Sequence, residues 1–272
     1  MSKVIKALTI QDFSCFGQCS ITVFLPIVSA FSVEVVSLPT GIYSTHTAAY
    51  PNWKSLDLTD QMAVITNHWN ENNLKFPLIH TGFMTSNQQF QNTLDTIKKC
   101  RSEETFLLID PILGDNGSLY KSMEPVMIDN MRKIVSMADC ITPNLTEACL
   151  ITNTPYSDSV DMDDILNKLS ALGPKHIILK SIRKDGEIGN LHYDCLTKEK
   201  HYSFAKFHEG FWHGCGDVLS SILAGFICKG KSINEAIDFA TSFISESISI
   251  TPSEHFYGIC FEQLIHKISE VK

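Results

Sequence analysis

Short apolar runs alternate along the chain with longer stretches in which apolar residues recur every three or four positions. The short runs predict strands at residues 3–10, 33–38, 76–80, 105–110, 139–142 and 176–181, and then a hairpin of residues 189–195 and 198–204. The longer stretches predict helices at residues 19–31, 58–73 (with Thr59 as N-cap), 86–99, 124–137, 144–151 and 161–172, and others that begin near residues 215, 233 and 261. This alternation predicts an α/β fold in which helices cover both faces of a mostly parallel central sheet.

Polar residues gather just after the predicted strand ends, at Asp12, Thr81, Asp110, Asn144 and Ser181. Because open α/β sheets bind their ligands at the carboxyl ends of the strands, we expect these residues near one site. Residues 11–18, which follow the first predicted strand, are expected to form a loop. No linker, repeat or low-complexity segment stands out, so residues 1–272 predict a single domain.

The most informative motif is His213-Gly214-Cys215-Gly216-Asp217, which an apolar run with helical spacing follows at once. Glycines let the backbone come close to a ligand, and the helix that starts there directs free N–H groups and a positive dipole end at an anion. An acid in the first turn suits one task, which is to deprotonate a hydroxyl that attacks a phosphoryl group held by those N–H groups. The alternative is an ordinary junction between a loop and a helix.

A second run, Gly225-Phe-Ile-Cys-Lys-Gly230-Lys231-Ser232, matches the P-loop consensus literally. A P-loop requires a strand before it and a helix after it, whereas the residues that precede this run have helical spacing. Gly230 is typical of the residue after a helix end, and Ser232 with Glu235 is typical of a capping box. We therefore predict a turn between two helices and no phosphate site.

Two loops carry candidate magnesium ligands. Asp110 and Asp115 lie in a Pro/Gly-rich segment after a predicted strand, and Glu147 follows Thr142-Pro-Asn144 at the start of a predicted helix. Carboxylates at strand ends hold Mg²⁺ mainly through its water molecules. For Asn144 and Glu147 helix capping is the alternative interpretation, and Asp110 is also compatible with a turn.

Composition excludes several classes of protein. The net charge is −8 and no run of Lys or Arg stands out, so nucleic acid is not an expected partner. No apolar run has the length of a membrane span, and we recognise no signal peptide. The nine cysteines are scattered without a C-x-x-C pair, which favours reduced thiols in the cytoplasm over disulfides or a zinc site.

Taken together, these residues resemble the pyridoxal/pyridoxamine kinase branch of the ribokinase-like superfamily, with the bacterial pyridoxamine kinases the most similar subgroup. The resemblance covers almost the whole chain. It rests on Ile10-Gln-Asp-Phe-Ser-Cys-Phe-Gly17, Cys19-Ser20, Leu38-Pro-Thr-Gly, Ser44-Thr-His-Thr47, His80-Thr-Gly82-Phe83, Asp-Pro-x-x-Gly-Asp from Asp110, Thr-Pro-Asn-x-x-Glu from Thr142, and Gly-x-Gly-Asp from Gly214. It implies a three-layer αβα sandwich and ATP-dependent phosphorylation of vitamin B6 on its 5′-hydroxymethyl group.

The resemblance also implies roles at the phosphate end. Asp217 would take the proton from the 5′-hydroxyl, and the N–H groups of Gly214, Cys215 and Gly216 would stabilise the moving γ-phosphoryl. Asp110 and Glu147 would organise Mg²⁺ and its waters. The ATP phosphates would lie along the following residues: Asp115, Asn144, Ser181, Gly214 and Gly216.

At the vitamin end, the resemblance implies that Asp12 and Thr47 contact the polar edge of the pyridine ring and that Phe83 flanks it. Residues 116–123, with Tyr120, would form a flap over both substrates. The partners implied are ATP and B6 vitamers, together with a second copy of the chain in a homodimer. Relatives often also use a monovalent cation such as K⁺.

Three positions depart from the pattern of many relatives: Cys215 stands where Thr is common, and Lys180 and Asp12 stand where animal enzymes carry Thr and Ser. Relatives that act on pyrimidines can have Lys at the position of Lys180. Two alternatives therefore stay open, a hydroxymethylpyrimidine kinase of thiamine synthesis and a non-catalytic binder of vitamin B6 or nucleotide. The first type usually carries Cys in place of Asp217, and the second has no need of a base there.

Overall fold

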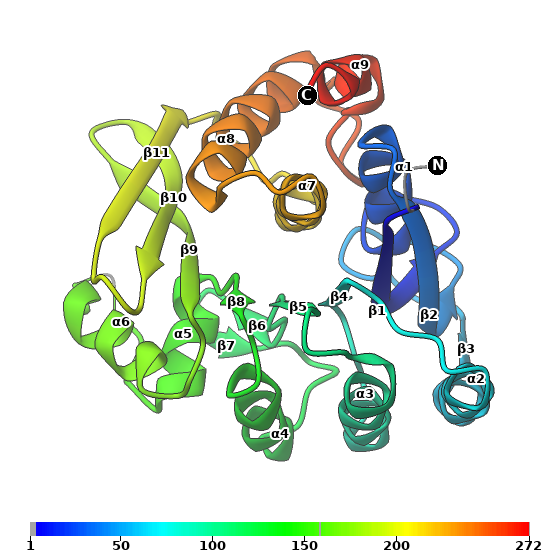
Figure 1. The fold of residues 1–272 in the computed structure, drawn as a ribbon. Coiled ribbons are helices and arrows are strands. Elements are labelled where there is room, and N and C mark those ends of the chain that lie inside the picture. Colours follow the sequence, from blue (N-terminus) through cyan, green and yellow to red (C-terminus); the bar gives the residue numbers. More distant parts are fainter. Residues whose placement is uncertain (1–3, 158, 272) are drawn as a thin grey trace.

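The computed structural model describes residues 4–157 and 159–271, and its central feature is a large sheet between two layers of helices (Figure 1). Across the sheet the strands follow the order β11-β10-β9-β8-β5-β4-β1-β2-β3. The six strands from β9 to β2 are parallel, whereas β10 and β11 at one edge and β3 at the other pair antiparallel. The predicted α/β class and the mostly parallel sheet are confirmed.

The strands of this sheet are β1 (Lys6–Ser14), β2 (Glu34–Tyr43), β3 (Ser55–Asp57), β4 (Leu78–Thr81), β5 (Phe106–Ile109), β8 (Cys140–Ile141), β9 (His176–Lys184), β10 (Glu187–Asp194) and β11 (Lys200–Lys206). A separate small hairpin consists of β6 (Gly114–Asp115) and β7 (Ser118–Leu119). In β1, Leu8 and Ile10 face one apolar core while Ala7 faces the other, which explains why the strand reads as a nearly continuous apolar run.

Two sets of helices cover the two faces of the sheet. One face carries α2 (Thr59–Glu71), α3 (Asn87–Cys100), α4 (Val126–Val135), α5 (Leu145–Thr152) and α6 (Met162–Ser170), seen below the sheet in Figure 1. The other carries α1 (Ile21–Ala30), α7 (Cys215–Cys228), α8 (Ile233–Ile250), η1 (Glu262–Leu264) and α9 (Ile265–Ser269). Each layer seals its own cluster of buried side chains against the sheet, so the fold is a three-layer αβα sandwich.

Local sequence explains where several helices begin. Ser86 accepts a hydrogen bond from the N–H of Gln89 at the start of α3, and Asn144 and Glu147 form a capping box at the start of α5. Thr59 is not the N-cap of α2, contrary to the prediction. Leu58 occupies that position, and Asp57 accepts the N–H of Thr59 at 2.7 Å.

The first two strands extend further than the hydrophobic pattern predicts. The start of the first predicted strand, Lys3, lies outside the described residues, but β1 continues through the expected loop as far as Ser14. Asp12 therefore lies inside a strand. The polar residues Gln11, Asp12 and Ser14 are buried there. A prediction based on apolar runs ends the strand before them because their side chains are polar.

The structure differs from the predicted elements in three further places. β9 extends past Ser181, so this serine also lies within a strand, with φ of +62°. The segment expected to form a loop and flap contains the hairpin β6–β7. The short edge strand β3 was not predicted, because three exposed residues carry no periodic signal.

Within residues 4–157 and 159–271, no helix has the combination of length and hydropathy that crossing a bilayer requires.

Candidate active site

The N-terminus of α7 is built to leave its amide groups available. Gly214 is the N-cap with φ of +81°, and among the described residues no side chain caps the helix. A Cβ at Gly214 would lie 2.5 Å from the carbonyl oxygen of Gln18, so only glycine fits here. The first helical hydrogen bond runs from Val218 N–H to Gly214 O, so the N–H groups of Cys215 and Gly216 precede the helical ladder. An anion is the natural partner of such groups.

Asp217 lies in the first turn of α7, among other acids. Its removal from bulk water raises its pKa to about 7, and the carboxylates of Asp110 and Asp12 add to this effect. The backbone of Ser20 and the charge of Lys180 oppose the rise. A carboxyl with a pKa near neutrality is suited to accept a proton in a catalytic step.

A largely buried lysine joins the two acids predicted to organise magnesium. Lys180 Nζ lies 2.7 Å from Asp110 Oδ1 and 3.9 Å from Glu147 Oε2. Burial lowers the pKa of Lys180, but the charges of Asp110 and Glu147 outweigh this effect and the net shift is upward. Asp110 also accepts a hydrogen bond from Ser220 of α7 at 3.0 Å. The carboxyl end of β5 is thereby tied to β9 and to α7.

The capping box of α5 fixes the position of Glu147. Glu147 Oε2 accepts the N–H of Asn144 at 2.7 Å, and Asn144 Oδ1 accepts the N–H of Glu147 at 2.8 Å. Asn144 Nδ2 also donates to the carbonyl of Gly114 at 2.9 Å, which connects α5 to β6. Helix capping, the alternative interpretation of these two residues, is therefore observed, and it places the Glu147 carboxylate beside Lys180.

The acids fit a hydrated magnesium ion better than a directly bound one. Both oxygens of Asp110 and both oxygens of Glu147 already accept hydrogen bonds from protein groups. Burial raises the pKa of Glu147, and the charge of Lys180 opposes the rise. A further cation nearby would stabilise the ionised carboxylate in the same way. Among the described residues no group of three His, Cys, Asp or Glu side chains is arranged to hold a metal. A cation that keeps its waters and also binds phosphate oxygens suits this arrangement.

Asp12 is buried beside the N-terminus of α1. Ser20 Oγ donates to one of its oxygens at 2.5 Å and Ser14 Oγ donates to the other at 3.0 Å. Burial raises the pKa of Asp12, and these two hydroxyls oppose the rise. The Asp12 carboxylate also contributes to the raised pKa of Asp217, so the two acids are electrostatic neighbours. Asp12 thus belongs to the same cluster of acids as Asp110 and Asp217.

The remaining predicted residues lie on segments around this cluster. Tyr120 directly follows β7. Burial raises the pKa of its phenol, and the negative charges of four acids add to this rise: Glu147, Asp115, Asp110 and Asp217. The predicted flap therefore lies beside the acids. Asp115 is in β6 and accepts the N–H of Asn116 at 2.8 Å. Phe83 follows β4, and its ring lies 6.4 Å from that of Tyr43. Thr47 and Ser181 complete the set; Thr47 lies in a turn after β2, and Ser181 is exposed.

Sequence reasoning missed the supporting roles of Lys180, Ser20 and Ser220. Lys180 stood out only as a departure from relatives, because lysines at strand ends are common. Ser220 could have been found from helical spacing, since it lies three residues after Asp217 and so lies on a neighbouring face of α7. Ser20 could not, because its contact with Asp12 depends on how α1 packs against β1.

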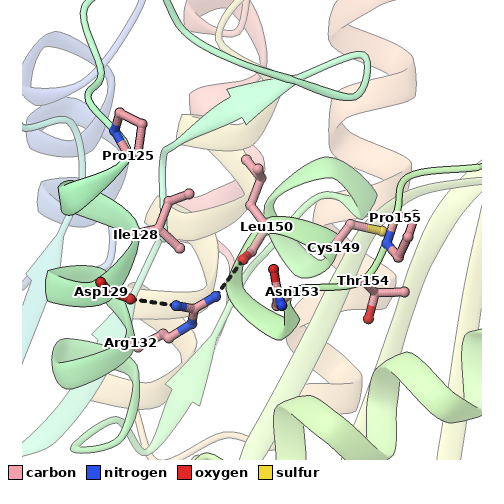
Figure 2. A pocket seen from close by; sticks show the side chains of 9 residues that line it. All are labelled: Pro125, Ile128, Asp129, Arg132, Cys149, Leu150, Asn153, Thr154 and Pro155. Atoms are coloured by element: carbon pink, nitrogen blue, oxygen red, sulfur yellow. Dashed lines mark hydrogen bonds and ion pairs between the residues drawn. The ribbon is translucent and has the colours of Figure 1, made fainter.

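A separate pocket of about 350 Å³ lies between α4 and the end of α5 (Figure 2). Arg132 lines it and donates from Nε and Nη2 to the carbonyls of Ile151 and Leu150, which satisfies the C-terminus of α5. The pocket is lined by Pro125, Ile128, Asp129, Arg132, Cys149, Leu150, Asn153, Thr154 and Pro155. These side chains are different from the acids and amide groups at the start of α7.

A three-layer αβα sandwich, with a helix N-terminus that no described side chain caps and a charged cluster beside it, is the architecture of a kinase of the ribokinase-like class. The chain belongs to the family described as phosphomethylpyrimidine kinase, whose family model matches residues 28–258. This match and the pyridoxal kinases among its relatives confirm the resemblance seen in the sequence.

Solved structures agree in fold over nearly the whole chain. A candidate phosphomethylpyrimidine kinase from Bacteroides thetaiotaomicron is 34% identical, with a TM-score of 0.94 over 98% of this chain and 94% of that chain. A second crystal form of that protein contains pyridoxal. Pyridoxal kinase from Lactobacillus plantarum is 27% identical, with a TM-score of 0.92 over 99% of this chain and 98% of that one. Among curated proteins, pyridoxal kinase from Dictyostelium discoideum is 28% identical over 86% of this chain and 80% of its own length.

Proposed function

We propose that the protein is an ATP-dependent kinase that phosphorylates the 5′-hydroxymethyl group of vitamin B6 for salvage to pyridoxal 5′-phosphate. The observation that carries the proposal is Asp217, a base with a pKa of about 7 directly after the amide groups of the α7 N-terminus. A protein that only binds vitamin or nucleotide has no need of a base there. The family membership and the B6-binding relatives support the choice of substrate.

The transfer itself needs a base and a place for negative charge. Asp217 accepts the proton of the 5′-hydroxyl while the oxygen of that hydroxyl forms a bond to the γ-phosphorus of ATP. The bond between the γ-phosphorus and the leaving ADP oxygen breaks. The N–H groups of Gly214, Cys215 and Gly216 stabilise the charge on the transferring phosphoryl. Protein positioning and electrostatics supply most of the rate in reactions of this kind.

Asp110 and Glu147 would hold Mg²⁺ through its waters, and the ion would neutralise charge on the ATP phosphates. The phosphates would lie along Asp115, Asn144 and Ser181. Tyr120, on the segment after β7, would close over the two substrates and keep water away from the γ-phosphoryl. The charged environment that Tyr120 shares with Asp115 and Glu147 supports this location for the flap.

Asp12, Thr47 and Phe83 would bind the pyridine ring. A carboxylate accepts several hydrogen bonds, so Asp12 can bind the ring while it keeps Ser14 and Ser20. We expect Asp12→Ala to raise the KM for B6 vitamers by about tenfold, since a bond to a charged group contributes roughly 1.5–3 kcal/mol, with little effect on the KM for ATP. A lower melting temperature with an unchanged vitamer KM would restrict Asp12 to holding the Ser14 and Ser20 hydroxyls.

The alternative substrate is hydroxymethylpyrimidine, which the description of the family favours. ATP consumption should be measured with pyridoxal, pyridoxamine, pyridoxine and hydroxymethylpyrimidine in parallel, with Asp217→Asn as the blank. Turnover of the B6 vitamers with a kcat/KM at least about tenfold above the pyrimidine supports the proposal. The opposite ranking assigns the protein to thiamine synthesis, and ligand binding without turnover makes it a binder.

We also propose that the protein is a homodimer in the cytoplasm. Phe13, Ile42 and Leu56 are cross-strand neighbours on β1, β2 and β3, and they are 39%, 38% and 59% exposed. A row of apolar side chains on an edge of a sheet suits a second copy of the chain. Leu56→Lys should then shift the mass measured by sedimentation towards the monomer.

All nine cysteines lie in the described part of the chain and are free thiols, which supports a reducing compartment.

A further inference from the structure

The ammonium of Lys180 lies at the junction of the acid cluster and the phosphate-binding helix. Its side chain is 11% exposed, and Nζ lies 2.7 Å from Asp110 Oδ1. A Cβ added at Gly216 would lie 3.7 Å from the same Nζ, so the ammonium borders the second residue of α7. The positive charge therefore lies between the acids that would organise Mg²⁺ and the amide groups that would hold the γ-phosphoryl.

Two carboxylates face this ammonium. Nζ lies 2.7 Å from Asp110 Oδ1 and 3.9 Å from Glu147 Oε2, so the acids on both neighbouring segments compensate its charge. Lysine is a compact charge with three donors on a flexible stem, so its position resembles that of a small monovalent ion bound to carboxylate oxygens. Unlike a dissolved ion, it cannot leave the site.

The same geometry leaves little room for a dissolved cation. Asp110 Oδ1 accepts from Lys180, and Asp110 Oδ2 accepts from Ser220 at 3.0 Å. A K⁺ ion bound to this carboxylate would have to displace one of those groups and would lie close to a like charge. The residues present therefore do not fit the monovalent cation that relatives often use.

We propose that Lys180 replaces a dissociable monovalent cation at the phosphate site, so that the kinase works without K⁺. The proposal rests on the function proposed above. The ammonium balances Asp110 and Glu147 when the site is empty. With ATP bound, it supplies positive charge at the phosphates beside the α7 amide groups.

Initial rates of the full chain should be compared in KCl, NaCl and tetramethylammonium chloride at equal ionic strength, with MgATP and pyridoxal. We expect wild-type rates to agree within about twofold, because the built-in charge does not depend on the salt. Lys180→Met keeps the length of the side chain and removes the charge. We expect this variant to lose about 10²-fold in kcat, the scale for removing one stabilising group, and to recover partly with KCl or ammonium chloride.

Melting temperature supplies a second readout that needs no turnover. A ligand that binds the native state stabilises it by mass action, so K⁺ and NH₄⁺ should raise the melting temperature of Lys180→Met relative to tetramethylammonium. The wild-type melting temperature should not distinguish these three salts. Lys184→Met, at an exposed position of the same strand, serves as the matched control and should behave as wild type.

Activation of wild type by K⁺ of more than about fivefold would overturn the proposal, as would a Lys180→Met variant whose rate and melting temperature ignore K⁺ and NH₄⁺. If Lys180→Met does not fold, Lys180→Arg keeps the charge, and it should remain active and independent of K⁺. Failure of the proposed function is recognised separately, as wild type that turns over none of the substrates in any salt. In that case the melting temperatures still decide the role of Lys180.

Discussion

Two helices of this protein begin with a glycine-containing sequence that suggests phosphate binding, yet their N-termini differ in one decisive respect. At α7, Gly214 takes the N-cap position without a capping side chain among the described residues. At α8, Ser232 accepts the N–H of Glu235 at 3.2 Å, and Glu235 accepts the N–H of Ser232 at 3.0 Å. The second helix satisfies its own first amide groups, whereas in the described structure no side chain caps those of the first.

The glycines of the two segments also serve different purposes. Gly225 of the P-loop-like run lies inside α7, where a Cβ would lie 2.0 Å from the ring of Phe31, so it allows α1 and α7 to pack closely. Gly230 has φ of +70° and follows the end of α7, as a helix C-terminus requires. Gly216, in contrast, borders the Lys180 ammonium. A literal match to a phosphate motif is thus explained by helix packing and helix termination.

An anion site in a protein needs two conditions at once. The amide groups must lack internal partners, and the surroundings must supply charge that suits the reaction. In the proposed kinase site the α7 N-terminus would meet both, because it lies beside Asp217, Asp110 and Lys180. The α8 N-terminus meets neither in the described structure, since its capping box is complete and the start of the helix is exposed.

The largest effect is expected from Asp217→Asn. Asparagine keeps the size of the side chain but cannot act as the base, so kcat should fall by at least about 10²-fold while the fold and ATP binding persist. Steady-state kinetics, together with an ATP titration followed by melting temperature, measure both properties. Near-normal turnover would refute the role of Asp217 and remove the main chemical difference between the two helix starts.

The pH dependence should follow the ionisation of the same residue. Asp217 accepts a proton only when it is deprotonated, so kcat/KM should fall as the pH is lowered through about 7, where its pKa lies. A single ionisation gives a slope of about tenfold per pH unit on the acid side. The measurement is a pH–rate profile at saturating MgATP. A flat profile across neutrality would show that another group, or no titrating base, controls the step.

A smaller effect on stability is expected from Ser232→Ala, which removes the N-cap of α8. Loss of a serine N-cap typically costs ~1 kcal/mol, which corresponds to a fall of about 2–4 °C in melting temperature for a chain of this size class. Both kcat and the KM for ATP should stay within about twofold of wild type. Ser232→Asp retains a capping side chain and should restore the melting temperature. Activity that falls while stability is unchanged would contradict the assignment of this segment as a helix cap.

The smallest effect is expected from Lys231→Ala. Lys231 lies in the turn between α7 and α8, where single substitutions are usually mild, so kcat and the KM for ATP should change by less than about twofold. In a true P-loop the same lysine would bind the phosphates, and its loss would abolish ATP binding. Kinetics at varied MgATP concentration distinguish the two outcomes, and the second would return the phosphate site to residues 225–232.

Local sequence predicted those features that depend on neighbouring residues. The helices that start at Cys215 and Ile233 begin where the pattern placed them, and the capping box at Ser232–Glu235 formed as expected. The capping box at Asn144–Glu147 was the alternative interpretation of those residues, and it is also observed. The parallel sheet followed from the alternation of strands and helices. The predicted ends of β1 and β9 were wrong, because neither extension continues an apolar run. In β1 the polar residues Gln11, Asp12 and Ser14 are buried, whereas in β9 the polar residues Arg183 and Lys184 are exposed.

The class of fold, the glycine at the start of α7 and the acid that follows it could be predicted from the chain alone, since each is specified by residues close together in the sequence. The tertiary structure alone decided that Lys180 lies 2.7 Å from Asp110, seventy positions away, and that Ser20 binds Asp12 across the packing of α1 on β1. Pairings of this kind depend on which strands become neighbours in the sheet and on how buried charges compensate one another. No hydrophobic periodicity and no local sequence motif marks such contacts. They form only when the sheet brings distant segments together.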